Sequence, residues 1–215
     1  SLLRLQIDHI DLYQAHVDDE NTPLEETLSA FTDLVKEGKV RAIGASNYSA
    51  DRLARALAVS RENGFTRYES LQPEYNLYQR AGFEEKVEDL CLKEQLGVIS
   101  YFSLASGFLT GKYRSADDLG QSQRGEGVKK YMNERGFRIL AALDQVAGDY
   151  GSSPARVALA WLMARPSVTA PIASATTLAQ LSDIVESTKL DLSREALAAL
   201  DMASAYEAVS PSISI

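Results

Sequence analysis

Polar and aromatic side chains stand at the ends of four short segments that are rich in apolar residues. Runs of this kind, several of them with β-branched residues, predict buried strands. A histidine, a hydroxyl, amide groups and an aromatic ring at strand ends can form hydrogen bonds and stacking contacts with a ligand. The pattern therefore predicts a chemical site at the strand ends. The side chains concerned are His16, Ser46, Asn47, Gln72 and Tyr101.

Helical segments separate these strands and determine how the strand ends are arranged. We expect strands over 7–13, 40–45, 68–72, 98–101 and 168–172, with amphipathic helices between them. Strands that alternate with helices form parallel sheets with right-handed crossovers. The alternation predicts an α/β fold, a (β/α)8 TIM barrel that is incomplete here, with about five strands in this chain. Such barrels carry their active sites at the carboxyl ends of the strands.

Local signals mark several helix ends. The stretch 22–25 has the pattern of a capping box with proline at the first helical position, and Ser49 is expected to cap the next helix. The apolar residues of 83–91 stand at helical spacing and predict one helix, with Cys91 on its buried face. Residues 111–133 are polar and without clear periodicity, which predicts a long insertion of functional or mobile character. Further helices are expected over 134–150, from 154 onward, over 178–185 and over 193–205.

The composition is that of an ordinary folded domain. Of 215 residues, 45% are hydrophobic and 24% are charged, which excludes a disordered chain. The net charge of −8 argues against a duplex nucleic acid as partner, and no apolar run approaches the length of a membrane span. The single cysteine, Cys91, allows no intrachain disulfide and fits a reducing compartment, so we expect a cytoplasmic protein. We expect no metal site.

Taken together and in their order along the chain, the four segments resemble segments of the aldo-keto reductase superfamily. The stretch 11–16 is similar to the family strand that ends in the active-site histidine. The stretch 44–47 is similar to the Ser-Asn pair that binds a nicotinamide carboxamide, and 72–76 to the segment that supplies a glutamine to the same amide. Residues 101–113 match the stacking and pyrophosphate segment. Each segment alone is a weak signal, but four of them in order at strand ends are highly specific.

The resemblance implies a nicotinamide cofactor that is held by its carboxamide and its ring. Ser46, Asn47 and Gln72 would bind the carboxamide, because together they offer donors and an acceptor. Tyr101 would stack on one face of the ring and leave the other face to the substrate. His16 would orient and polarise the carbonyl of a small aldehyde or ketone. The cofactor supplies the chemistry, and the protein supplies position and electrostatics.

The segment after the stacking tyrosine is implied to hold the cofactor pyrophosphate. Many relatives carry Ser-Pro where this chain has Phe102-Ser103, so backbone contacts are expected there. Lys112 suits a charge-assisted contact with a phosphate in an otherwise acidic protein. For Arg124, a contact with a cofactor phosphate and a solvated loop charge are equal alternatives. The positions implied are Phe102, Ser103, Leu104, Lys112 and Arg124.

The last expected strand and the helix after it resemble the family's site for the adenosine 2′-phosphate. Ser174, Thr176 and Gln180 fall at binding positions, and Asp183 falls where the adenine amino group can be held. Thr176 and Gln180 are neutral where many relatives carry lysine or arginine. The resemblance therefore implies NADP(H) as the family default and leaves NAD(H) open. The alternative is an ordinary surface helix with a capped N-terminus.

The catalytic tyrosine, lysine and aspartate of the family lie on strands before the histidine strand, and this chain starts just before that strand. A tyrosine of this kind donates a proton at a pKa tuned by its neighbours. We therefore expect residues 1–215 to form a single aldo-keto reductase domain that lacks the first three βα units. On this expectation, the 215 residues alone would not turn over a carbonyl substrate.

Three functions compete at this stage. The first is an NADP(H)-dependent oxidoreductase that reduces aldehydes or ketones to alcohols. The second is a cofactor-binding regulatory or interaction subunit, similar to the potassium-channel beta subunits, in which the histidine position can differ, so His16 favours the enzyme. The third is an unrelated barrel such as an aldolase, against which Ser46, Asn47 and Gln72 together argue. The sequence leaves the substrate and the oligomeric state open.

Overall fold

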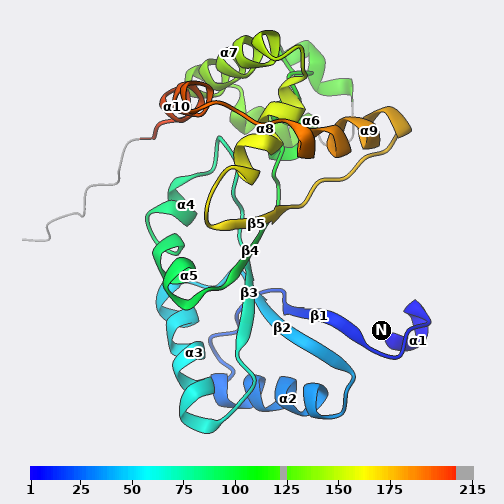
Figure 1. Cartoon of the computed structure of the whole chain (residues 1–215), viewed down its shortest axis with the longest axis vertical. Helices are drawn as coiled ribbons and strands as arrows, with labels where there is room; N and C mark the ends of the chain where they lie inside the picture. The colour runs from blue at the N-terminus through cyan, green and yellow to red at the C-terminus, as the bar shows by residue number, and fades with distance from the viewer. Residues whose placement is uncertain (122–124, 207–215) are drawn as a thin grey trace, which may run out of the picture. The chain divides into compact units, whose positions relative to one another are not determined.

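In the computed structural model, which describes residues 1–121 and 125–206, the chain divides into two compact units. The first unit comprises residues 1–73 and 84–99, and the second comprises residues 74–83 and those from 100 onward. Five strands are hydrogen-bonded in sequence order, and the pairs from β1 to β4 are parallel (Figure 1). The alternation of strands and helices confirms the predicted α/β class. The strands are β1 (Ile10–Ala15), β2 (Val40–Ser46), β3 (Tyr68–Gln72), β4 (Gly97–Ser100) and β5 (Val168–Pro171).

Two helices cover the strands of the first unit. Helices α2 (Leu24–Lys36) and α3 (Ala50–Asn63) contact each other, and α2 contacts β2 (Figure 1). Each helix turns one apolar face inward, so that Leu28 and Leu53 are fully buried. Burying a leucine side chain contributes about 2 kcal/mol to stability. The unit also contains the short helices α1 (Leu2–Leu5) and α5 (Glu88–Glu94).

The two faces of the first three strands differ in character. On one face, the Phe31 ring of α2 makes edge contacts with Tyr13 of β1, at 5.8 Å between ring centroids, and with Tyr68 of β3, at 6.3 Å. Successive side chains of a strand point to opposite faces. Gln14, the next residue of β1, therefore points away from α2. The face opposite α2 carries the polar side chains of the strand ends.

The start of α3 was predicted correctly, and the start of α2 was not. Ser49 is the N-cap of α3, and its hydroxyl oxygen accepts a hydrogen bond from the backbone N–H of Arg52. At α2 the N-cap is Pro23, and no side chain caps the helix. The Thr22 hydroxyl instead donates to Asp19 Oδ2 at 2.7 Å. The turn before the helix thus uses the hydroxyl that the capping box required.

The single helix expected over 83–91 is also wrong. The structure has two short helices, α4 (Ala81–Glu84) and α5, with Val87 in a non-helical conformation between them. The apolar residues serve two cores, because Phe83 packs on Tyr75 in the second unit whereas Cys91 is buried in the first. The burial of Cys91 is as expected, and it raises the pKa of the thiol to about 12.

The second unit is mainly helical. In Figure 1, α7 (Glu134–Asp149), α8 (Pro154–Met163) and α10 (Arg194–Ala203) lie together, and α9 (Leu178–Glu186) contacts α8. Each of these helices begins at a side-chain cap, whose oxygen accepts a backbone N–H three residues on: Asn133, Ser153, Thr177 and Ser193. Such caps are worth about 1 kcal/mol each. The expected bounds of these helices are confirmed to within a few residues.

The segment 111–133 is more ordered than expected within its described part. It forms the short helices η2 (Ala116–Gln121), α6 (Gly125–Val128) and η3 (Lys129–Tyr131), and Val128 and Tyr131 are fully buried. Gly125 permits this arrangement, because a Cβ at that position would collide with the carbonyl oxygen of Leu119. A few buried side chains therefore fix the conformation of a segment whose sequence shows no helical periodicity.

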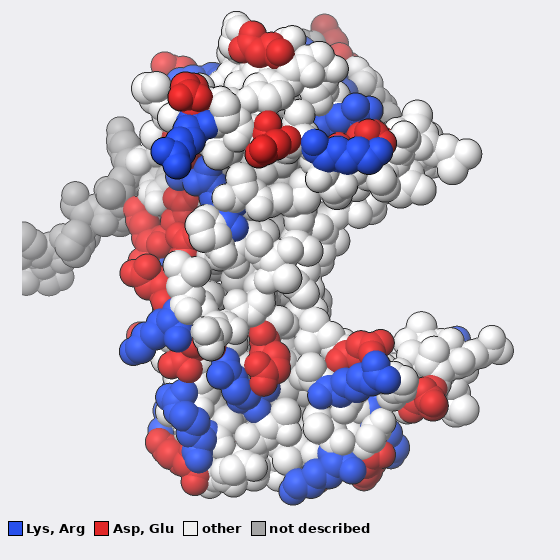
Figure 2. Space-filling view, viewed as in Figure 1, with Lys and Arg blue, Asp and Glu red and all other residues white. Residues whose placement is uncertain are grey.

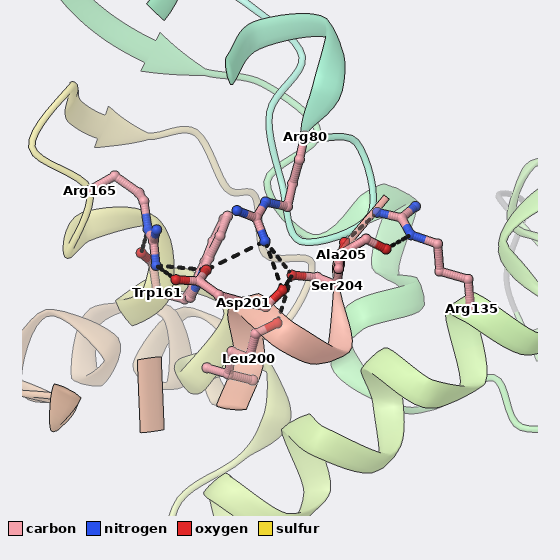
Figure 3. A network of polar contacts seen from close by, with 8 residues as sticks. All are labelled: Arg80, Arg135, Trp161, Arg165, Leu200, Asp201, Ser204 and Ala205. Carbon is pink, nitrogen blue, oxygen red and sulfur yellow. Dashed lines mark hydrogen bonds and ion pairs between the residues drawn. The ribbon is translucent and has the colours of Figure 1, made fainter. Parts of the chain in front are cut away.

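An arginine network holds the C-terminal end of α10 (Figure 3). Asp201 accepts from Trp161 Nε1 at 2.9 Å, and its carboxylate contacts Arg165 at 3.0 Å and Arg80 at 3.5 Å. Arginines also donate to backbone carbonyls at the end of the helix. Their positive charges stabilise the negative end of the helix dipole. Burial lowers the pKa of Arg135. We call this set the arginine network: Arg80, Arg135, Trp161, Arg165, Asp201 and Ser204.

Charged side chains of both signs are interspersed on the face of the molecule that Figure 2 shows. Many of them are paired, for example Arg114 with Asp144 at 2.7 Å and Arg55 with Glu62 at 3.2 Å. Exposed pairs of this kind contribute little to stability. No helix among residues 1–121 and 125–206 combines the length and the apolar character needed to cross a bilayer.

Candidate active site

Four of the predicted site residues lie in the first unit, and hydrogen bonds link them. The Ser46 hydroxyl, at the end of β2, donates to the backbone carbonyl of Gln72 at 2.8 Å. Asn47 Nδ2 donates to Ser46 Oγ at 3.2 Å and to the carbonyl of His16 at 2.9 Å. The ends of β1, β2 and β3 are therefore joined by side chains that stood far apart in the sequence.

Asn47 reaches both neighbours because its backbone is left-handed, with φ of 57°. Asparagine tolerates this conformation better than most residues. This turn directs the Asn47 side chain towards the end of β1, where it donates to the backbone carbonyl of His16. The His16 imidazole is exposed and makes no hydrogen bond within the described chain, so it can meet a ligand.

A second layer of polar side chains extends this cluster. Gln72 Nε2 donates to Gln14 Oε1 at 2.7 Å, and Gln14 Nε2 donates to Ser70 Oγ at 3.3 Å. Gln72 Nε2 thus uses one of its two hydrogens, and within the described residues Gln72 Oε1 accepts none. One acceptor and one N–H can pair with an N–H and the carbonyl oxygen of a carboxamide. We call the linked set the strand-end network: Gln14, His16, Ser46, Asn47, Ser70 and Gln72.

The remaining predicted residues lie in the second unit, beginning with Tyr101 after β4. The Tyr101 ring meets the Phe102 ring at 5.3 Å between centroids, and burial, followed by the charge of Glu74, raises the pKa of its hydroxyl. Phe102 is 46% exposed. Ser103 is buried, and its hydroxyl donates to the carbonyl of Ser100 at 3.1 Å. The Ser103 side chain is therefore bound within its own chain.

The next turns are built from unusual backbone. The carbonyl of Leu104 accepts from the N–H groups of Gly107 and Leu109 at 2.8 and 3.2 Å, inside the short helix η1 (Ala105–Thr110). Lys112 runs over Gly107, and its Nζ lies 4.9 Å from the centre of the Tyr113 ring. Lys112 is exposed, so its charge faces solvent. Arg124, the other cation predicted here, lies outside the described residues.

The predicted adenosine residues lie at the N-terminal end of α9. Ser174 and Thr176 are exposed, and Gln180 Oε1 accepts from Thr176 N at 2.8 Å. Gln180 thereby completes the cap of α9. Asp183 accepts from Ser153 Oγ at 2.8 Å and from Arg156 Nε at 2.6 Å. Both Asp183 oxygens thus have a partner in the chain, so an adenine amino group would have to share them.

Backbone strain concentrates where ligand contacts were predicted. Six described residues other than glycine have positive φ. Gln6 and Gln95 end helices, which is an ordinary place for this conformation. The other four are Asn47, Phe102, Ala105 and Ser106, all in the segments predicted to bind a cofactor. Strained residues cluster at binding sites because surrounding contacts must hold them in place. Within each unit, the unusual backbone thus lies in segments that were predicted to contact a cofactor.

Comparison with known proteins gives the family of this chain. The sequence profile of the aldo/keto reductase family matches residues 1–205. The chain belongs to the aldo/keto reductase family. It is 35% identical over 202 residues to the uncharacterized oxidoreductase YrpG of Bacillus subtilis and 33% identical over 208 residues to the L-glyceraldehyde 3-phosphate reductase of Escherichia coli. These matches confirm the resemblance on which the residue roles were predicted.

A solved structure of the family has the same fold. This chain superimposes on a thermostable aldo-keto reductase in complex with the inhibitor epalrestat with a TM-score of 0.75 and 27% identity, over 94% of this chain and 62% of that one. The two relatives named above are likewise matched over 94% of this chain and 60% of their own length. The chain thus spans about three fifths of these family members.

The strand-end network includes residues that the sequence analysis did not assign to the site. Ser70 lies inside a predicted strand and Gln14 directly follows one, where a polar residue is usually a solvent-facing one. The available signal was Gly44, because a glycine within a strand often marks a close approach of its neighbours. In the described part of the chain, no three His, Cys, Asp or Glu side chains gather in a way that could hold a metal ion.

Proposed function

We propose that this chain is the nicotinamide-binding part of an NADP(H)-dependent aldo-keto reductase that reduces small aldehydes or ketones to alcohols. The observation that carries the proposal is the strand-end network, in which Gln72 presents an open acceptor beside His16, Ser46 and Asn47. The family supports the reaction class, and the whole residue range 1–215 is proposed as one domain of that family. A cytoplasmic location is proposed with it.

Each residue has a physical task in the proposal. Gln72, Ser46 and Asn47 bind the carboxamide and fix the rotation of the nicotinamide ring, because hydride transfer needs close and aligned approach. Tyr101 stacks on the ring, and Lys112 contributes charge to the pyrophosphate. His16 donates a hydrogen bond to the substrate carbonyl oxygen, which polarises it. The bound cofactor supplies the hydride.

The adenosine end of the cofactor is assigned to the second unit. Ser174, Thr176 and Gln180 can donate hydrogen bonds to a phosphate at the N-terminal end of α9, where the helix dipole favours an anion. These side chains are neutral, so discrimination between NADP(H) and NAD(H) rests on hydrogen bonds and on the dipole of α9. We therefore propose NADP(H) as the cofactor, with only a modest preference over NAD(H).

The experiment is a titration of the protein with NADPH and with NADH, followed by fluorescence of the reduced nicotinamide. We expect saturable binding of NADPH and a loss of about tenfold in affinity for Gln72→Leu, since one good hydrogen bond is worth about 1.4 kcal/mol. Gln145→Leu, on the exposed face of α7, is the matched control and should bind as the wild type does. Absence of saturable binding would overturn the proposal.

Turnover separates the enzyme from a cofactor-binding subunit. In the longest natural form of the protein, NADPH oxidation in the presence of a small aldehyde tests for reduction. There His16→Ala should lower kcat/KM by about a hundredfold while NADPH affinity stays within about threefold. Binding without turnover, in the longest natural form of the protein, would favour the regulatory subunit.

A further inference from the structure

Gln14 of β1 bonds two other side chains of the strand-end network. It is half-buried, two residues before His16. Its Oε1 accepts from Gln72 Nε2 at 2.7 Å, and its Nε2 donates to Ser70 Oγ at 3.3 Å. Both ends of the Gln14 amide are therefore in use. A half-buried glutamine that bonds two other side chains holds its own rotamer and theirs.

Two features of the sheet make these contacts possible. Gln14, Gly44 and Ser70 stand in register on β1, β2 and β3, so Gln14 and Ser70 meet across the glycine. A Cβ at position 44 would collide with Ser70 Oγ and would lie 3.1 Å from Gln14 Cγ. Gly44 thus opens the space through which two strands that are not neighbours share a hydrogen bond.

The second feature is a shift of register between β2 and β3. Ile43 pairs with Tyr68, but Gly44 pairs with Ser70, so β3 has one extra residue at this point. The extra residue turns Ser70 to the face opposite Tyr68, which itself contacts Phe31 of α2. A bulge of this kind commonly re-aims a side chain beside an active site. Here it directs Ser70 towards Gln14.

From this geometry we propose that Gln14 is a positioning residue for Gln72. Because Gln72 Nε2 donates to Gln14, Gln72 Oε1 is held outward as the acceptor for the –NH2 group of a nicotinamide carboxamide. Ser70 Oγ accepts from the other end of the Gln14 amide. The inference rests on the proposed function, and it adds Gln14 as the residue that determines which atom of Gln72 meets the cofactor.

The test compares two dinucleotides that differ only at the group concerned. NADP+ has a carboxamide, and its 3-acetylpyridine analogue has a methyl ketone without the –NH2 donors. Dissociation constants are measured by quenching of protein fluorescence. We expect the wild type to prefer NADP+ by about tenfold, as one hydrogen bond to a carbonyl acceptor allows. Gln14→Met should reduce that preference to below about threefold, while Gln145→Met leaves it unchanged.

Gln14→Glu tests the direction of the hydrogen bond. A carboxylate still accepts from Gln72 Nε2 and from the Ser70 hydroxyl, so this variant should retain most of the wild-type preference. If Gln14→Glu instead loses the preference for NADP+ as Gln14→Met does, the assigned direction of the hydrogen bond is contradicted. Adenosine 2′,5′-bisphosphate lacks the nicotinamide, so its affinity should be the same in all variants, which also reports whether each variant is folded.

The outcomes separate the two proposals. If the wild type binds neither dinucleotide, the proposed function fails, and the role of Gln14 fails with it. If the wild type prefers NADP+ and Gln14→Met shows the same preference, the role of Gln14 alone is overturned. A glutamine that merely stabilised the sheet would change the unfolding free energy and leave the discrimination between the two dinucleotides intact.

Discussion

The strand-end network and the arginine network both join side chains that are distant in the sequence, but they differ in what they leave open. In the arginine network, Asp201 meets Trp161, Arg165 and Arg80, and the arginines donate to carbonyls of their own chain. In the strand-end network, Gln72 Oε1 has no partner among the described residues and His16 projects into solvent. A satisfied network stabilises a fold, whereas an open acceptor beside a strained turn indicates a binding site.

The backbone beneath each network also differs. The arginine network sits at the end of α10 and beside α8, where helix dihedrals are regular. The strand-end network lies between a register shift in β3 and the left-handed Asn47. Its geometry thus depends on irregular backbone that neighbouring contacts must hold. We therefore expect substitutions in the first network to affect stability and substitutions in the second to affect binding.

The largest effect should follow from Asp201→Ala. The change leaves Trp161 Nε1 without an acceptor and removes the carboxylate from two arginines that are less than one-fifth exposed. We expect the free energy of unfolding, measured in urea, to fall by about 3 kcal/mol. Under conditions where the variant is folded, its NADPH affinity should stay within about twofold of the wild type. A loss of binding without a loss of stability would remove the distinction between the networks.

Gly44→Ala should have the next largest effect, and it should affect both properties. The new methyl group collides with Ser70 Oγ and displaces Gln14, so we expect about 2 kcal/mol less stability and weaker binding of NADPH. Ser70→Gly in the same chain removes the atom in conflict. The double variant should therefore be more stable than Gly44→Ala alone, by about 1 kcal/mol. Additive losses in this cycle would show that Ser70 is not the cause.

Ser70→Ala should have the smallest effect. Gln14 loses one partner but keeps its hydrogen bond with Gln72. We expect the free energy of unfolding to change by less than about 1 kcal/mol and the dissociation constant of NADPH to rise by no more than about threefold. Thermal unfolding and fluorescence titration measure the two quantities. A tenfold loss of affinity would mean that Ser70, rather than Gln14, holds the position of Gln72.

Much of the architecture was predictable because its signals are local. Ser49, Ser153 and Ser193 cap helices as their positions suggest, and the strands lie within about three residues of their expected bounds. The failures occurred where a local signal has a competing partner. Thr22 bonds Asp19 instead of capping α2, and the apolar residues of 83–91 are shared between two cores. The Thr22 bond is a competition within four residues, whereas the division of 83–91 depends on packing against residues distant in the sequence.

For the site, the sequence alone determined the residue types at the strand ends and, through their order, the family. Ser46, Asn47 and Gln72 could be selected because strand ends and family segments are both readable along the chain. Only the tertiary structure decided that Gln72 bonds Gln14, 58 residues away, and that Gly44 and a register shift in β3 allow it. Strand pairing brings these residues together, and because its register depends on contacts across the whole sheet, one-dimensional periodicity cannot specify it.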